Sequence, residues 1–221
     1  MTRLGAGLAA FGGAFALPAQ QAAAQAAPGA PWTPTRHPQD DWFDAIPGQH
    51  RFFFDTISAM GVGDSITFAS NFYTTSKSGY GLTDADNAVV ICLRHYATPF
   101  AFTDAMWAKY GAPIAERIKF TDPKTHQTPT INVYETTGYG VLLNNRETTL
   151  SAMVKRGTHF AVCDAATRAF AGVAAGKLGL QTNAVYEELK ANTIPNCHFV
   201  ASGIVGVNRA QERGYAIQYI G

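Results

Sequence analysis

The chain has 221 residues, of which 47% are hydrophobic and 15% are charged, and its formal net charge is +1. This composition suits one globular domain with a substantial core. Because the chain has no basic run and no acidic block, it gives no sign of a nucleic-acid partner or of a solvating tail.

The first 26 residues have the order of a secretory signal. Arg3 is followed by an apolar stretch from Leu4 to Leu17 and later by the small-residue sequence Ala24-Gln25-Ala26. This order predicts export to the periplasm, with cleavage after Ala26. The apolar stretch is too short for a spanning helix, so we expect no membrane span in the mature chain. An uncleaved anchor or a disordered Ala-rich leader is the alternative.

Residues 27–50 are rich in proline and polar residues and predict an extended arm. We expect its aromatic side chains to anchor it to the body of the protein or to a neighbouring subunit. These side chains are Trp32, Trp42 and Phe43. Residues 51–221 then form the predicted α/β domain.

Five short apolar segments predict strands, separated by segments with helical spacing. The strands are His50–Thr56, Ala88–Leu93, His159–Cys163, Cys197–Ala201 and Tyr215–Ile220, and the helices cover residues 63–77, 100–110, 148–156, 164–175, 182–192 and 203–213. The run Ala88–Leu93 is apolar throughout, as expected for a central parallel strand. The alternation predicts a single α/β domain, with a mostly parallel five-stranded sheet covered by helices on both faces.

Two polar stretches follow strands at the carboxyl edge of this sheet, where open α/β sheets bind ligands. Arg94 and His95 follow the second strand, and Cys163 ends the third. If these strands are neighbours, the three side chains share one edge and are the candidate catalytic residues. The helix predicted to begin at Asp164 directs its N-terminal N–H groups at the Cys163 sulfur, which favours the nucleophilic thiolate. Arg94 or His95 would strengthen this effect, and Asp164 would oppose it.

Each candidate also has a plainer interpretation. A cysteine at the end of a strand often packs as a small core residue, and a histidine in such a loop often hydrogen-bonds the backbone. A metal or haem site built on His95 is a further hypothesis, although no paired Cys or His spacing typical of zinc sites occurs. No cofactor motif is complete, because Gly61-Val62-Gly63-Asp64 has only part of a dinucleotide-binding pattern.

The three cysteines, Cys92, Cys163 and Cys197, cannot all pair internally, so we expect at least one free thiol. In a parallel sheet Cys163 and Cys197 lie at opposite edges, about 13 Å apart for a four-residue strand. A disulfide needs Cα atoms within roughly 7 Å of each other. We therefore predict no disulfide between Cys163 and Cys197.

The carboxyl-terminal third of the chain carries an ordered pattern. GTHFAVCDAA is a strand that ends in cysteine, VYEELKANTIPN is an amphipathic helix, and HFVASGIVGVNRAQERGYAIQYI runs through a Ser-Gly and a helix to the last strand. In these features residues 157–220 resemble the DsrE/DsrF-like family of small sulfur-relay proteins, whose fold is also called YchN-like. The earlier strand AVVICLRH also suits this family, and residues 107–150 look like an insertion relative to its compact members.

The resemblance implies a homo-oligomer, commonly a trimer or a hexamer. It also implies that Cys163, which matches the sulfur-carrying cysteine of relay members, holds sulfur as a persulfide and exchanges it with a sulfur-donor or thiol partner protein. Arg94 and His95 would then shape the pocket. The alternative is a non-enzymatic oligomeric module that binds a small ligand through the 107–150 insertion and its aromatic side chains. These side chains, Trp107, Tyr134 and Tyr139, would otherwise pack in the core or at an interface.

Overall fold

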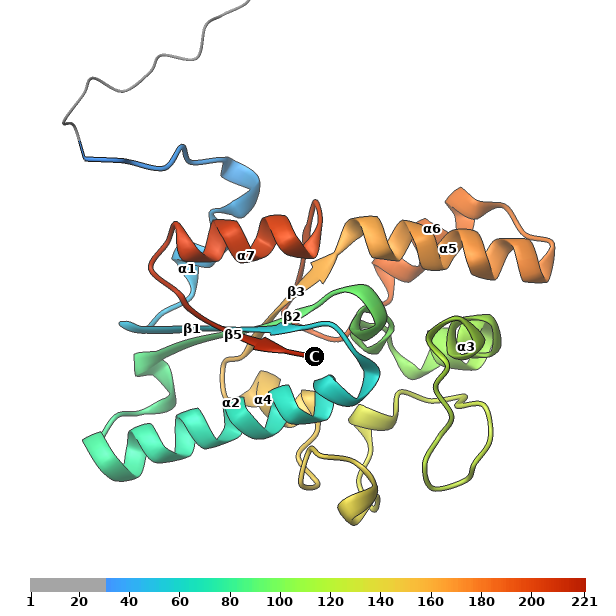
Figure 1. The fold of residues 1–221 in the computed structure, drawn as a ribbon, viewed down its shortest axis with the longest axis horizontal. Helices are drawn as coiled ribbons and strands as arrows, with labels where there is room; N and C mark the ends of the chain where they lie inside the picture. Colours follow the sequence, from blue (N-terminus) through green and yellow to red (C-terminus); the bar gives the residue numbers. More distant parts are fainter. Residues whose placement is uncertain (1–30) are drawn as a thin grey trace, which may run out of the picture. The chain divides into compact units, whose positions relative to one another are not determined.

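Five strands form one all-parallel sheet in the order β4-β3-β2-β1-β5 in the computed structural model, which describes residues 31–221 (Figure 1). The strands are β1 (His50–Thr56), β2 (Asn87–Leu93), β3 (His159–Cys163), β4 (Cys197–Val200) and β5 (Ala216–Ile220). The predicted α/β class and parallel sheet are therefore confirmed. Each strand also lies within one residue of its predicted bounds.

Helices cover both faces of the sheet within residues 36–221, which form one compact unit. On one face lie α2 (Ala59–Tyr80) and α4 (Leu150–Lys155), and on the other lie α1 (Trp42–Ala45) and α7 (Gly203–Gln211) (Figure 1). Three more helices pack against one another at the carboxyl edge: α3 (Asp104–Ile118), α5 (Asp164–Leu178) and α6 (Thr182–Ala191). Within the described chain, every helix is too short or too polar to span a bilayer.

The alternation of side chains along the strands divides the core in two. Val89, Ile91 and Leu93 of β2 belong to the larger cluster, on the side of α2. Val90 and Cys92 belong to the smaller cluster, on the side of α1 and α7. All seven residues of β2 are buried, as expected for a strand covered on both faces.

The helix predicted over residues 100–110 differs most from the structure. Residues His95–Ala101 form a 3-10 helix, and α3 begins at Asp104 and continues through Gly111 to Ile118. Gly111 does not end the helix, because its role is to let a loop approach. A Cβ atom at this position would lie 2.5 Å from the carbonyl oxygen of Pro129.

Helix α2 is longer at both ends than its predicted span. Ser58 caps its start by accepting a hydrogen bond from the Gly61 N–H at 2.9 Å. Gly81 ends the helix in the left-handed conformation, with φ of 71°, which favours glycine. The helix therefore ends three residues after its predicted end at residue 77.

The extended arm predicted over residues 27–50 is wrong for residues 38–45. Pro38–Asp40 form a 3-10 turn and Trp42–Ala45 form α1. The Phe43 side chain fixes this turn of helix, since it is 0% exposed and packs against the rings of Phe53 and Tyr215. The predicted export signal at residues 1–26 and the arm residues 27–30 lie outside the described residues.

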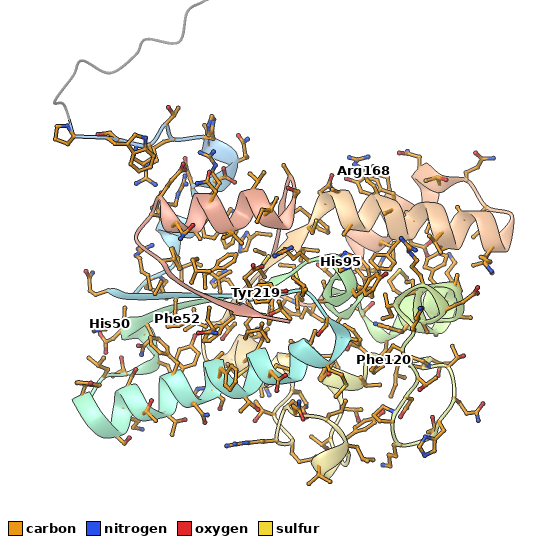
Figure 2. All side chains as sticks on the ribbon, in the orientation of Figure 1. His50, Phe52, His95, Phe120, Arg168 and Tyr219 are labelled. Atoms are coloured by element: carbon orange, nitrogen blue, oxygen red, sulfur yellow. The ribbon has the colours of Figure 1, made fainter. Side chains whose placement is uncertain are left out.

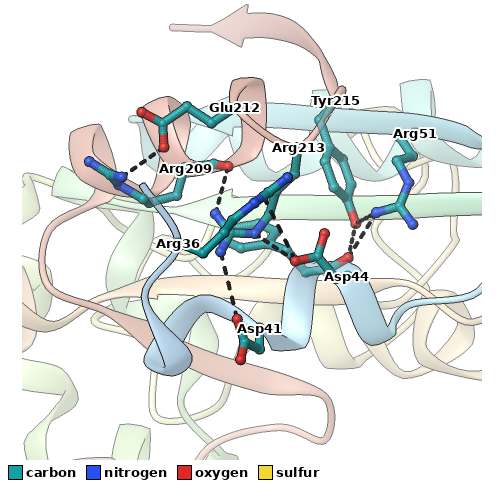
Figure 3. Close-up of polar contacts among 9 residues, drawn as sticks. Arg36, Asp41, Asp44, Arg51, Arg209, Glu212, Arg213 and Tyr215 are labelled. Carbon is teal, nitrogen blue, oxygen red and sulfur yellow. Dashed lines mark hydrogen bonds and ion pairs between the residues drawn. The ribbon is translucent and has the colours of Figure 1, made fainter. Parts of the chain in front are cut away.

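Arg213, which follows α7, forms ion pairs with residues in and next to α1 (Figure 3). Its buried guanidinium donates a hydrogen bond from Nε to Asp44 Oδ2 at 3.1 Å, and its Nη2 atom lies 3.9 Å from Asp41 Oδ1. The Tyr215 hydroxyl donates to the Phe43 carbonyl oxygen at 2.8 Å. Ion pairs and a buried aromatic side chain together hold the segment that precedes β1 on the α7 side of the sheet.

Candidate functional site

Cys163 lies at the junction between β3 and α5, as the sequence predicts. It is the last residue of the strand and the N-cap of the helix. Its Sγ atom accepts a hydrogen bond from the Ala166 N–H at 3.4 Å. The residue is only 6% exposed, so a reactant must be small or must displace neighbouring atoms to reach the sulfur.

Arg94 directly follows β2, the strand that pairs with β3. Leu93 of β2 pairs with Val162 of β3, so Arg94 and Cys163 are the residues that follow the last pair of this ladder. The Arg94 guanidinium is directed at Asp55 of β1, to which it donates from Nε at 2.5 Å and from Nη2 at 2.9 Å. These hydrogen bonds raise the pKa of Arg94. The charge of Arg94 is therefore balanced by a buried carboxylate.

Sequence reasoning did not single out Asp55. The sequence feature that could have indicated Asp55 is a carboxylate near the end of the aromatic strand HRFFFDT. A charge that is buried in such a strand needs a partner. Asp55 pairs in register with Cys92. Asp55, Cys92 and Arg94 therefore line the carboxyl end of β1 and β2 on the α7 side of the sheet.

Asp164, which was expected to oppose a charge on Cys163, is already paired. Its carboxylate accepts hydrogen bonds from the Arg168 Nε at 2.9 Å and from the Tyr186 hydroxyl at 2.5 Å, and Lys190 Nζ lies 4.0 Å away. The Arg168 guanidinium lies over the Tyr186 ring at 3.9 Å (Figure 2 labels Arg168). These contacts hold the Asp164 charge on the α6 side.

The start of α7 covers Arg94. A Cβ atom on Gly203 would lie 2.3 Å from both the Cβ and the Cδ atoms of Arg94. Only glycine therefore lets the helix pack on the arginine stem while the guanidinium stays on Asp55.

We expect Gly203→Ala to destabilise the protein by about 1–3 kcal/mol, because the added methyl group must displace Arg94 or α7. Urea unfolding followed by circular dichroism measures the change. Gly172→Ala on α5 is the matched control, since a Cβ there meets no atom within 4 Å and should stabilise the helix slightly. Equal stability of Gly203→Ala and the wild type would contradict the expectation.

His95 directly follows Arg94 along the chain and is labelled in Figure 2. Its side chain is exposed, its φ is 53°, and its ring stacks on Tyr96 with centroids 4.0 Å apart. It lines a small cavity of about 120 Å³ with Tyr96, Arg117, Phe170 and other residues of α5. This cavity includes Ala166, whose N–H donates to the Cys163 Sγ atom, whereas the Arg94 guanidinium is directed at Asp55.

All three cysteines are free thiols. Cys163 pairs with Val200, whereas Cys197 pairs with Phe160 at the other end of the same ladder. The predicted separation of Cys163 and Cys197 is therefore confirmed. Burial raises the pKa of Cys92 well above its ordinary value and that of Cys197 to about 12, so neither ionises at neutral pH.

Two histidines that the sequence leaves scattered meet on the α1 side of the sheet. His159 Nδ1 and His198 Nε2 are 2.9 Å apart, and the Trp42 ring stacks on the His198 ring with centroids 4.1 Å apart and planes 2° apart. The two histidines are far apart in sequence, and only the pairing of β3 with β4 brings them together. The spacing of the two histidines in the sequence does not predict that they are in contact.

We expect the pair to make stability depend on pH. Burial lowers the pKa of His159, and burial together with the neighbouring His159 lowers that of His198 from 6.5 to about 4. Between these values the unfolded chain binds more protons than the folded chain, so this contribution is fully present above about pH 6.5 and falls toward about pH 4. Urea unfolding across this range should show a weaker pH dependence for His198→Gln. An unchanged dependence would contradict the expectation.

Within residues 31–221, no group of three or more His, Cys, Asp or Glu side chains is arranged to hold a metal ion. Trp107, Tyr134 and Tyr139, the aromatic side chains considered for a ligand pocket, are all buried in the larger core cluster. Comparison of the chain with protein-family models, with curated proteins and with solved structures finds no match.

Proposed function

We propose that this protein is an exported, DsrE-like sulfur carrier that uses Cys163. The observation that carries the proposal is the position of Sγ, which caps α5 and accepts the Ala166 N–H. A thiolate at this place is stabilised by the positive end of the helix. Cys92 and Cys197 are poor competitors, because burial raises the pKa of both thiols.

The proposed reaction is a two-step exchange of sulfane sulfur. The Cys163 thiolate attacks the outer sulfur of a persulfide donor, a new S–S bond forms, and the donor leaves as a thiolate. A thiolate of the acceptor then attacks the outer sulfur on Cys163 and regenerates the Cys163 thiolate. Because Cys163 is only 6% exposed, this route favours donors with a small or extended reacting end.

Arg94 has a positioning role in this proposal. Its guanidinium holds Asp55, and its stem supports the start of α7 at Gly203. His95 lines a small cavity that includes Ala166, the residue that donates to the Cys163 Sγ atom, and in this proposal it shapes the approach to the sulfur.

Incubation of the native protein with a hydropersulfide donor should add the mass of one sulfur atom, located on Cys163 by peptide mass spectrometry. Iodoacetamide should modify the same residue first, because the thiolate is the nucleophile. Cys163→Ser should lose both modifications, and Cys197→Ser should keep them. An unmodified Cys163 in the folded protein under both treatments would refute the proposal.

A second candidate function is the binding of a small ligand near the 107–150 segment. A cavity of about 540 Å³ lies between the end of α3 and the end of α5 and is lined by Phe120, Lys119 and Lys177, among others. Glu116, which also lines the cavity, pairs with Lys177 at 2.8 Å, so Lys119 is the lysine that favours a small anion with an apolar part. Thermal-shift titration with aromatic carboxylates tests this idea, because Ala112→Trp, which fills the cavity, should remove the shift and Cys163→Ser should not. No shift with any of these compounds would argue against this function.

We also propose that the protein is a homo-oligomer. Within the described residues β5 pairs only with β1, and Tyr219 of β5 is exposed. At the same edge of the sheet, on the face covered by α2, lies a groove of about 400 Å³. It is lined by aromatic side chains, among them Phe52, Phe68 and Phe72 (Figure 2 labels Phe52 and Tyr219). Light scattering of the purified protein should give a multiple of the chain mass, and a monomer at micromolar concentration would contradict this.

Export to the periplasm is the remaining part of the proposal. Cell fractionation should place the protein in the periplasm, and intact mass should show cleavage near Ala26. Recovery of the full-length chain from the cytoplasm would contradict it.

A further inference from the structure

Two imidazole nitrogens converge on the side of the sheet that carries α1. His159 begins β3 and His198 lies on β4, opposite Ala161. Strand alternation puts both side chains on one face. Their nearest nitrogens, Nδ1 of His159 and Nε2 of His198, are 2.9 Å apart, and both side chains are partly exposed.

The separation of 2.9 Å is that of a hydrogen bond between the two rings. It also brings two imidazoles within reach of one metal ion once this hydrogen bond is broken, because imidazole nitrogens bind such ions at about 2.0–2.1 Å. Imidazole suits Cu²⁺ and Ni²⁺, and both ions lie at the tight-binding end of the divalent first-row series.

The protonation state of the pair also suits a metal ion. Burial lowers the pKa of both histidines, so both rings are neutral at pH 7, and neutral imidazole is the form that binds metal. In the hydrogen bond between the rings, one nitrogen carries the proton. Metal binding requires this proton to move to the other nitrogen of its ring, and it requires the His159 ring to turn about χ2, which is a soft torsion.

Trp42 supports the site from behind. Its ring is parallel to that of His198 and in contact with it, so it limits the positions that His198 can take. Since both histidines are partly exposed, water can occupy the remaining coordination positions. The protein would supply two ligands and solvent the others.

We propose that His159 and His198 form a two-imidazole binding site for a divalent transition-metal ion of the Cu²⁺ or Ni²⁺ type. The site is separate from Cys163, which lies at the other end of β3. It makes no use of the sulfur exchange proposed above.

Titration of the full-length protein with NiCl₂ should show one bound ion per chain by calorimetry and quenching of Trp42 fluorescence. Trp42→Phe should bind the ion without that quenching. His159→Gln and His198→Gln should each weaken binding by roughly tenfold or more, whereas His50→Gln, which removes an exposed histidine, and Cys163→Ser should bind like the wild type.

Electron paramagnetic resonance of the wild-type protein with one equivalent of Cu²⁺ tests the site without any substitution. The spectrum should be tetragonal, with hyperfine structure from two imidazole nitrogens. The proposal is overturned if the wild type binds no ion, if both histidine variants bind as the wild type does, or if the spectrum shows thiolate ligation. Loss of binding in Cys163→Ser with retention in the histidine variants would assign the ion to Cys163 instead.

Discussion

Arg94→Ala should lower the free energy of unfolding by roughly 3 kcal/mol, because it leaves a buried carboxylate without its counter-charge. Asp55 is 4% exposed. In the native protein it accepts two charge-assisted hydrogen bonds from Arg94, at 2.5 and 2.9 Å. The variant also removes the side-chain stem on which Gly203 and the start of α7 pack.

Urea unfolding of the purified variant measures this loss. Arg168→Ala is the matched control, because its ion pair with Asp164 involves a guanidinium side chain that is 59% exposed and should contribute less than about 1 kcal/mol. Replacing both partners with apolar residues, Asp55→Leu with Arg94→Met, should recover much of the loss, since no buried charge is then left unpaired. A variant Arg94→Ala as stable as Arg168→Ala would show that Asp55 does not depend on the pair.

Phe43→Ala should cost about 3–5 kcal/mol, as expected for removal of a fully buried aromatic side chain. Phe43 packs against Phe53 and Tyr215, and its carbonyl oxygen accepts hydrogen bonds from the Tyr215 hydroxyl and from Arg51. Loss of the ring leaves a cavity on the α7 side of the sheet and releases α1. The stacking of Trp42 on His198 should therefore weaken as well.

Thermal and urea unfolding measure the effect of Phe43→Ala, and the near-ultraviolet circular dichroism of Trp42 reports on α1. Tyr80→Ala is the control, because Tyr80 is 82% exposed at the end of α2 and its loss should change stability by less than about 0.5 kcal/mol. If Phe43→Ala were no more destabilising than Tyr80→Ala, the segment before β1 would not be part of the folded core.

The strands could be predicted because the pattern and the length of their apolar segments favour a strand over a helix. Ala88–Leu93 is apolar at every position and too short for a buried helix. The position of Cys163 between strand and helix followed from the same pattern. The α1 helix could not be found in this way, since four residues show no periodicity and Phe43 is held by residues far along the chain.

The candidate site was predicted in part for a similar reason. Order along the chain placed Arg94 and Cys163 at carboxyl ends of strands, and the pairing of β2 with β3 brings these two ends to the same edge of the sheet. The partner of Arg94 could not be predicted, because it depends on the order of the strands in the sheet. This order places β1, which contains Asp55, on the side of β2 opposite to β3. The His159–His198 contact depends likewise on the pairing of β3 with β4.

The place of β5 in the sheet has a consequence for synthesis of the protein on the ribosome. Strands β1 to β4 emerge in an order in which each can pair with the strand made just before it, but one flank of β1 is filled only by β5. Until residues 216–220 have been translated, that flank has unpaired backbone groups beside Phe52 and Phe54. Nascent chains stalled before this point would therefore present an open strand edge, which is a template for association between chains.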